Sequence, residues 1–166
     1  MPDVVELILA DHREFEELMR GLRDVSAERS VLRSEFAALL VAHADAEERE
    51  VYPELRRHAS STDQEVEHGE EEHAEINQAL LAFLEVGDVE GEAYDEKLEE
   101  LVEVVNHHTN EEEQTLLNDA RVKLSESERQ SLGEGFLAAR KAMLDAGCGR
   151  VEIVRSLVTK TADRIG

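Results

Sequence analysis

Two pairs of a histidine and a glutamate, each separated by three residues, are the strongest chemical feature of the sequence. They are His43 with Glu47 and His108 with Glu112. Residues four apart on a helix stand one above the other, so both side chains of each pair can reach the same metal centre. Mixed imidazole and carboxylate ligands without sulfur fit iron or manganese better than structural zinc or calcium. The two pairs therefore predict a transition-metal site.

Two more histidines lie on the apolar stripes of predicted helices. His12 alternates in steps of three and four with apolar residues of the first helix, and His73 does so in the third, where Glu70 lies in the same lane. Such steps keep side chains on one helix face, so each of four helices directs a histidine into the core. Buried ionisable groups without partners cost several kcal/mol each, and a bound cation is the simplest compensation. The candidate ligands are His12, His43, Glu47, Glu70, His73, His108 and Glu112.

A metal-free interpretation competes with this one. A single core histidine is usually held by hydrogen bonds alone, and the same side chains could form a buried polar network. Four histidines and two glutamates in register favour the metal site over that network. His107 is interpreted as a solvated neighbour of His108, and His58 as a cation at a helix C-terminus. Tyr52 and Tyr94 are interpreted as packing residues, although a tyrosine beside iron can also bind it or donate a hydrogen bond.

The elements that must position these residues are all helical. Aromatic residues make up only 4% of the chain and there are two prolines, a composition that favours helices over strands. Capping patterns begin three of the helices, at Asp3, Thr62 and Ser125. Pro53 predicts a kink or an altered turn within the second helix. The predicted helices span residues 3–21, 26–58, 62–87, 91–118, 125–147 and 150–165.

These segments predict an all-α fold with two parts. Residues 1–120 are expected to form an up-down four-helix bundle that holds the site between its helices. Residues 121–166 are expected to form a C-terminal helical extension with two amphipathic surfaces. These surfaces could cover the open end of the bundle or form a dimer contact, so both a monomer and a homodimer remain open.

The composition limits the partners. With 40 acidic against 18 basic residues the net charge is −22, which disfavours nucleic acid and anionic membrane surfaces and suits a cation. The one cysteine, Cys148, allows neither an intramolecular disulfide nor a thiolate metal cluster. The N-terminus lacks the pattern of a signal peptide, and no apolar stretch approaches the roughly 20 residues that span a bilayer. We therefore expect a soluble, cytoplasmic protein.

In its ligand motifs the sequence resembles the hemerythrin family, the HHE cation-binding domains. The resemblance covers about residues 1–120. Its matching elements, in family order, are Asp11-His12, His43-x3-Glu47 followed by Tyr52-Pro53, Glu72-His73 and His108-x3-Glu112. The resemblance implies two non-haem iron ions joined by an oxo or hydroxo bridge. It further implies that Glu47 and Glu112 bridge the irons, with His12 and His43 on one iron and His73 and His108 on the other.

One departure from the family bears on function. Oxygen-carrying hemerythrins have a second histidine four residues after the first in the third helix, where this chain has Asn77. Glu70, one turn before His73, is a candidate for the missing ligand. Four histidines leave an open position on both irons, which favours peroxide chemistry across the pair over reversible carriage. Some similar hemerythrin-like proteins are associated with peroxide decomposition. Catalase-type decomposition of hydrogen peroxide is therefore expected, with a dioxygen or nitric oxide carrier or sensor, and iron buffering, as alternatives.

Overall fold

The computed structural model describes residues 2–58 and 62–165, and within these ranges it is helical without β-strands. The prediction of an all-α fold is confirmed. The elements are α1 (Val4–Arg23), α2 (Arg29–Ala46), a π-helical turn η1 (Glu47–Val51), α3 (Tyr52–His58), α4 (Asp63–Leu84), α5 (Glu92–Gln114), α6 (Leu116–Lys123), α7 (Glu126–Asp145) and α8 (Val151–Ile165).

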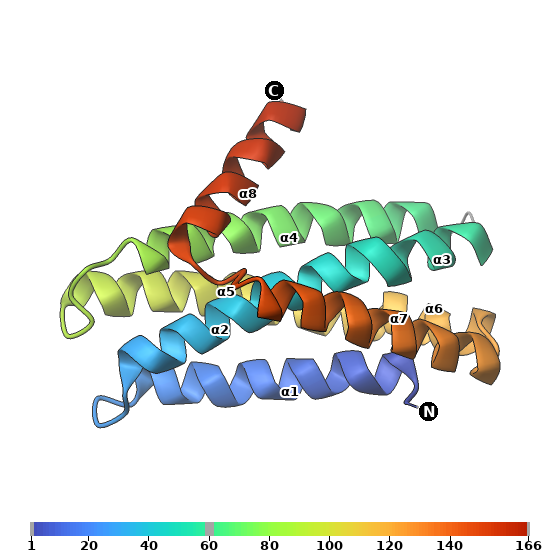
Figure 1. Ribbon diagram of the computed structural model, residues 1–166, viewed down its shortest axis with the longest axis horizontal. Helices are drawn as coiled ribbons and strands as arrows, with labels where there is room; N and C mark the ends of the chain where they lie inside the picture. The colour runs from blue at the N-terminus through green and yellow to red at the C-terminus, as the bar shows by residue number, and fades with distance from the viewer. Residues whose placement is uncertain (1, 59–61, 166) are drawn as a thin grey trace.

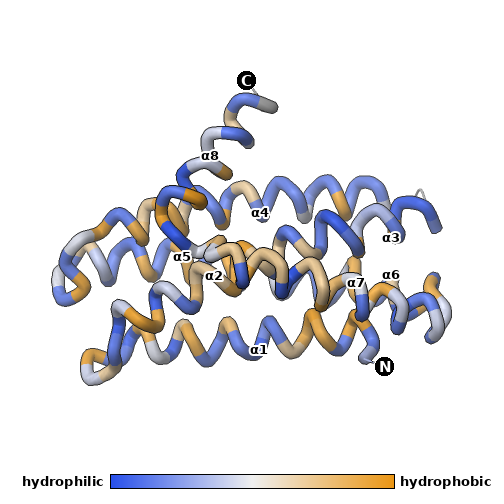
Figure 2. Tube along the Cα trace, viewed as in Figure 1, coloured by the Kyte–Doolittle hydropathy of each residue, from blue (hydrophilic) through white to orange (hydrophobic). Residues whose placement is uncertain are grey.

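The helices α1, α2, α4 and α5 lie side by side and alternate in direction, as Figure 1 shows. Contacts join α1 to α2, α2 to α4, α4 to α5, and α5 back to α1, so the four helices enclose a common interior. The colouring in Figure 2 shows hydrophilic and hydrophobic residues alternating along the long helices. This amphipathic pattern explains why they assemble around one core.

The core consists of two apolar clusters with a polar layer between them. One cluster contains Phe15, Phe36, Leu80 and Leu98, and the other contains Ile8, Val51, Val66 and Leu117, each among further apolar residues. The gap between the clusters falls at the same level on all four helices. The residues in this gap are buried and polar: Asp11, His12, His43, Glu47, Glu72, His73, His108 and Glu112. Apolar layers therefore enclose the polar layer along the bundle axis, from both ends.

The second predicted helix is interrupted by the π-helical turn directly before Pro53. Proline has no N–H for the carbonyl four residues earlier, and its ring crowds that carbonyl. The backbone N–H of Tyr52 instead bonds to the carbonyl of Glu47, five residues back. The altered turn expected at Pro53 therefore lies just before it. Glu47 begins this turn, and π-helical turns are frequent at functional sites.

The fourth predicted helix also divides, at Thr115. Its backbone dihedral angles, φ −110° and ψ −80°, lie outside the helical region and separate α5 from α6. The Thr115 hydroxyl donates to the carbonyl of Glu111 at 2.8 Å, a local bond that bends helices. The break lets Leu116 and Leu117 join the apolar cluster of Ile8.

Three capping patterns were predicted, and two act as helix caps. The Asp3 carboxylate accepts from the backbone N–H of Val5 at 2.8 Å, and Ser125 forms a reciprocal capping box with Glu128. Thr62 lies at the N-cap position of α4, as predicted, but its side chain makes no capping hydrogen bond there. Its hydroxyl donates to the carbonyl of Leu55 at 2.9 Å and so ties the start of α4 to α3.

The two C-terminal helices lie against the sides of the bundle. The helix α7 contacts α1, α2 and η1, whereas α8 contacts α4 and then turns away from the bundle (Figure 1). Cys148 is buried in the turn between them. A side chain on Gly149 would collide with the backbone of Ala38, so glycine there permits the close approach of this turn to α2. Within the described ranges, no helix combines the length and apolarity needed to cross a membrane.

Candidate metal centre

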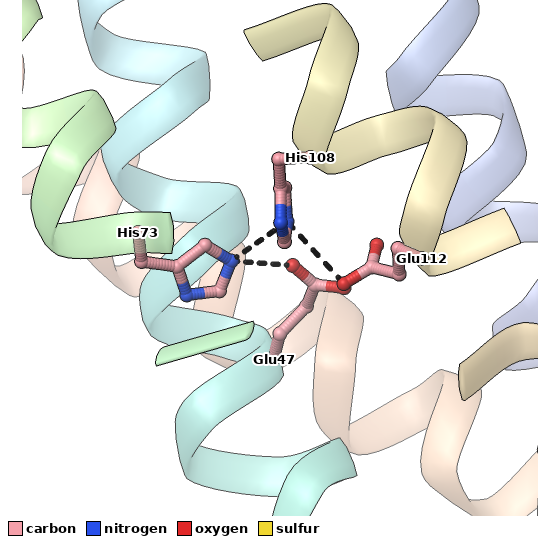
Figure 3. A group of neighbouring side chains, drawn as sticks. All are labelled: Glu47, His73, His108 and Glu112. Carbon is pink, nitrogen blue, oxygen red and sulfur yellow. Dashed lines mark hydrogen bonds and ion pairs between the residues drawn. The ribbon is translucent and has the colours of Figure 1, made fainter. Parts of the chain in front are cut away.

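The polar layer brings together six of the seven candidate ligands from four helices. His43 Nε2 and His73 Nε2 lie 3.0 and 3.2 Å from Glu47 Oε1. His12 Nε2 lies 3.1 Å from Glu112 Oε1, and His108 Nε2 lies 3.4 Å from Glu112 Oε2. Figure 3 shows four of these side chains converging. Each glutamate therefore contacts one histidine from α1 or α2 and one from α4 or α5.

A second set of carboxylates contacts the outer nitrogens of the same histidines. Three of the four outer nitrogens have a carboxylate oxygen at hydrogen-bond distance: His43 Nδ1 with Asp11 at 2.8 Å, His108 Nδ1 with Glu72 at 3.0 Å, and His12 Nδ1 with Glu113 at 3.2 Å. The fourth, His73 Nδ1, lies 3.6 Å from Glu48. Such carboxylates place the proton on Nδ1 and direct the lone pair of Nε2 inward, which is the orientation of a metal ligand.

These outer carboxylates form a closed ring around the bundle. Each belongs to one helix and contacts the histidine of the next, in the order α1 to α2, η1 to α4, α4 to α5 and α5 to α1. Each is also the sequence neighbour of an inner residue: Asp11 of His12, Glu48 of Glu47, Glu72 of His73 and Glu113 of Glu112. A carboxylate directly beside an inner residue is visible in the sequence. Glu48 and Glu113 were nevertheless missed, because they lie in acidic stretches of the kind that usually form solvated faces.

The spacing of the inner atoms fits a cation. His73 Nε2 and His108 Nε2 lie 3.1 Å apart. Two adjacent nitrogen ligands with bonds of about 2.1 Å to one ion are separated by roughly 3.0–3.4 Å. Within the described ranges, neither carboxylate oxygen of the fully buried Glu47 has a donor in good hydrogen-bond geometry, although the Nε2 atoms of His43 and His73 lie close to Oε1. A buried carboxylate in that state is stabilised by a bound positive charge.

Electrostatic coupling within the layer is strong. Burial by itself would lower the pKa of His43, but the charge of Glu47 and the hydrogen bond to Asp11 raise it to about 10. The pKa of His108 is also raised well above its usual range against burial, chiefly by Glu112, whose own pKa is lowered well below its usual range by His108. Without a metal ion, His43 and His108 therefore carry compensating positive charge as protons. Metal binding at such a site releases those protons.

Tyr52 contributes a hydroxyl group to the same layer. It donates to Glu112 Oε2 at 2.7 Å, lies 3.5 Å from His73 Nε2, and its ring stacks on that of His73. Burial and the charge of Glu112 raise its pKa well above the usual value for tyrosine. A Cβ on Gly69 would lie 3.0 Å from this hydroxyl, so glycine there leaves room for it. The interpretation of Tyr52 as a packing residue is incomplete, because it also donates a hydrogen bond.

Glu70, the seventh candidate, does not reach the cluster. It forms an ion pair with Arg56 at 3.3 Å, and 39% of its side chain is exposed. Its lane on α4 is shared with His73, but one turn earlier the interior of the bundle is filled by Tyr52 and Val66. Its proposed role in place of the missing histidine is therefore not supported. His107 is mostly exposed, as expected of a solvated neighbour of His108.

The two halves of the cluster have different surroundings. The open half consists of His73 and His108. A cavity of about 190 Å³ is lined by His108, Glu112, Glu72 and His68, and a larger groove between α4 and α8 is lined by His73 and Glu48. Neither cavity is lined by His12 or His43, which form the closed half. These two cavities therefore reach the cluster at its open half.

The closed half is covered by α7. The ring of Phe136 lies edge-on to His43, with centroids 5.6 Å apart, and Phe15 contacts the same histidine from α1. The guanidinium group of Arg140 donates to Asp11, whose other oxygen accepts from His43. Burial by itself would raise the pKa of Asp11, but His43 and Arg140 lower it below its usual value. An extension that follows the bundle in sequence thus supports one half of the cluster.

A buried layer of histidines and carboxylates inside a four-helix bundle defines a metal-binding helical-bundle protein. The family model described as the Hemerythrin HHE cation binding domain matches residues 3–120, and the chain belongs to this family.

A solved structure shares the whole fold. It is that of a hemerythrin HHE cation-binding domain-containing protein from Mycobacterium kansasii, described as a homologue of Rv2633c. The two chains are 23% identical, and the match has a TM-score of 0.81 and covers 94% of this chain and 99% of the other. The shared fold therefore extends beyond the bundle into the C-terminal helices. A search of curated protein sequences gives no match.

Proposed function

We propose that this protein binds two non-haem iron ions, one in each half of the cluster. His12 and His43 hold the ion of the closed half, His73 and His108 hold the ion of the open half, and Glu47 and Glu112 bridge them. The observation that carries this proposal is that each glutamate contacts one histidine of each half, at 3.0–3.4 Å. A carboxylate placed in this way can ligate two ions at once.

We further propose that the protein decomposes hydrogen peroxide. In this reaction one peroxide molecule is oxidised to dioxygen, and the two electrons and two protons that it releases reduce a second molecule to two waters. The iron pair supplies the reversible storage of two electrons. The protein's own residues admit the peroxide through the cavity beside His108 and Glu112, and the apolar clusters keep larger reductants out. The Tyr52 hydroxyl holds Glu112 in place from the open half.

Metal analysis of the protein after growth in iron-rich medium tests the first part of the proposal. The expected result is about two irons per chain, because each of the two halves offers ligands for one ion. An oxo bridge between the irons is expected to add a near-ultraviolet oxo-to-iron charge-transfer band. One zinc ion per chain, or no metal, would contradict it.

An oxygen electrode tests the second part. Hydrogen peroxide added to the iron-loaded protein is expected to release dioxygen. The activity is expected to be lost in Glu47→Ala and kept in His58→Ala, because His58 lies apart from the cluster and pairs with Glu54 and Glu128.

A second function is favoured by one observation. Both cavities reach the open half alone, and reversible binding of dioxygen or nitric oxide needs a single open metal position. A carrier or sensor would bind these gases reversibly in its reduced state and release no dioxygen from peroxide. A protein that only buffers iron would do neither.

A further inference from the structure

A second group of histidines and glutamates lies beside the polar layer, on its surface side, and shares Glu72 with it. It contains His68 and Glu72 from α4 and His107 and Glu111 from α5. His68 Nε2 lies 2.8 Å from Glu111 Oε2 and 3.5 Å from Glu72 Oε2. His107 Nε2 lies 3.2 Å from Glu72 Oε2 and 3.4 Å from Glu111 Oε2. Two nitrogens and two oxygens therefore surround one point, and both histidines contact both carboxylates.

Three of these four separations, 3.2, 3.4 and 3.5 Å, are close to the edges of a metal coordination sphere, whereas the 2.8 Å between His68 and Glu111 is a hydrogen-bond length. A tetrahedral ion with bonds of about 2.0–2.1 Å to nitrogen and oxygen places its ligands roughly 3.3–3.4 Å apart. The four separations between imidazole nitrogens and carboxylate oxygens run from 2.8 to 3.5 Å. Two neutral imidazoles and two carboxylates would also balance the charge of a divalent ion.

The position of Glu72 gives independent support. Its side chain is 93% buried, because 7% is exposed, which is unusual for a surface carboxylate. One oxygen accepts from His108 Nδ1 at 3.0 Å, whereas the other, Oε2, is directed toward His68 and His107. Oε2 is buried, and no hydrogen bond from the described part of the chain reaches it. A surface hydrogen bond accounts for His68 with Glu111, whereas the buried Oε2 of Glu72 meets only the two half-exposed imidazoles, His107 at 3.2 Å and His68 at 3.5 Å.

We propose that His68, Glu72, His107 and Glu111 form an outer binding site for a divalent first-row transition-metal ion, for which Zn²⁺, an ion that takes four ligands, serves as the probe. The outer site lies at the surface end of the cavity whose inner end is lined by His108 and Glu112. Glu72 belongs to both ends, with one oxygen toward each. An ion in the outer site is therefore held at the entrance and connected to the inner cluster through a single carboxylate.

The outer site can be tested with Zn²⁺ added to the iron-loaded, full-length protein. Unbound metal is first removed by gel filtration, and Zn²⁺ binding is then measured by competition with a chromophoric chelator. The wild-type chain is expected to take up one additional Zn²⁺. Loss of a residue that only supports a metal ligand weakens metal binding by roughly 10–100-fold. The double variant His68→Ala/His107→Ala removes two ligands, so its affinity for Zn²⁺ is expected to fall by more than that. Both histidines are more than half exposed, so their replacement leaves the fold intact.

Three controls make the result decisive. His58→Ala removes another surface histidine that pairs with two carboxylates and should bind Zn²⁺ as wild type does. The iron content per chain, measured on the same samples, shows whether the inner cluster is intact. The wild type is expected to bind one Zn²⁺ more than the double variant, whichever metal occupies the inner cluster. In crystals soaked with Zn²⁺, the anomalous peak should lie between His68 and His107. Equal Zn²⁺ binding by wild type and double variant, or a peak elsewhere, would overturn the outer site.

Discussion

The closed half of the metal centre and its open half offer the same donor groups in different surroundings. His43 in the closed half lies between two aromatic rings, and its outer nitrogen is held by a buried aspartate that Arg140 holds in turn. His73 in the open half stacks on Tyr52, and its outer nitrogen lies 3.6 Å from Glu48, a carboxylate that is 41% exposed. The comparison indicates that His43 is fixed more firmly than His73.

The helix α7 produces much of this difference. It follows the bundle in sequence, outside residues 3–120 of the family match, yet Phe136 and Arg140 both act on the closed half. Among the described residues, no corresponding helix covers the cavity beside His108, whose walls are mostly polar residues. What packs outside the four-helix framework therefore decides how far each half of the cluster is covered.

The largest effect is expected where both halves depend on one side chain. Glu112→Ala should lose most of the iron, because Glu112 contacts His12 in one half and His108 in the other. Metal analysis of the purified variant measures the loss. Glu70→Ala, on the surface of α4, should keep its iron. A loss of iron in this variant would show that Glu70 is a ligand after all.

Opening the closed half should cost stability as well as iron. Phe136 is fully buried, so Phe136→Ala should lower the free energy of unfolding by about 3–5 kcal/mol, measured in urea. Phe83→Ala removes an equally buried ring from the apolar cluster of Phe15, away from the metal centre, and should destabilise by a similar amount. Only Phe136→Ala should also lower iron occupancy. Equal iron in the two variants would mean that α7 does not support the closed half.

The outer carboxylates provide a finer comparison of the halves. Asp11→Asn removes the charge that orients His43 and should weaken iron binding by about 10–100-fold. Glu48→Gln should have a smaller effect, because Glu48 is partly exposed and lies 3.6 Å from His73. Competition of each variant with an iron chelator measures its iron affinity and so gives the ratio of the two losses. A larger loss of iron affinity in Glu48→Gln than in Asp11→Asn would mean that the open half, not the closed half, is the more rigid.

The smallest effect concerns pH and belongs to the open half. Glu65 lines the cavity, and its hydrogen bond with Asp119, together with burial, raises its pKa from 4.5 to about 7. Between these values the folded chain keeps a proton that the unfolded chain has lost. Stability from this group should therefore fall as pH rises from about 4.5 to 7. Urea unfolding of Glu65→Gln across this range should lack that decrease, whereas the exposed Glu67→Gln should retain it.

The inner residues could be predicted because helix periodicity determines which side chains face the core. His12, His43, His73 and His108 each lie in an apolar stripe, and Glu47 and Glu112 lie four residues beyond two of them. The predicted helix ends also lie close to the observed ones, except at two interruptions. At Glu47–Val51 the proline two residues later changed the local hydrogen bonding, and at Thr115 the threonine hydroxyl did so. Such local effects alter a turn without changing which face of the helix is buried.

The sequence by itself determined the all-α fold, the level at which polar residues interrupt the core, and the donor atoms of the inner cluster. The tertiary structure alone decided that Glu48 and Glu113 contact histidines, that Glu70 does not, and that α7 closes one half. Periodicity describes one helix at a time. A residue next to a core position points about 100° away from it, toward a neighbouring helix or toward water, and only the packing of that neighbour decides which.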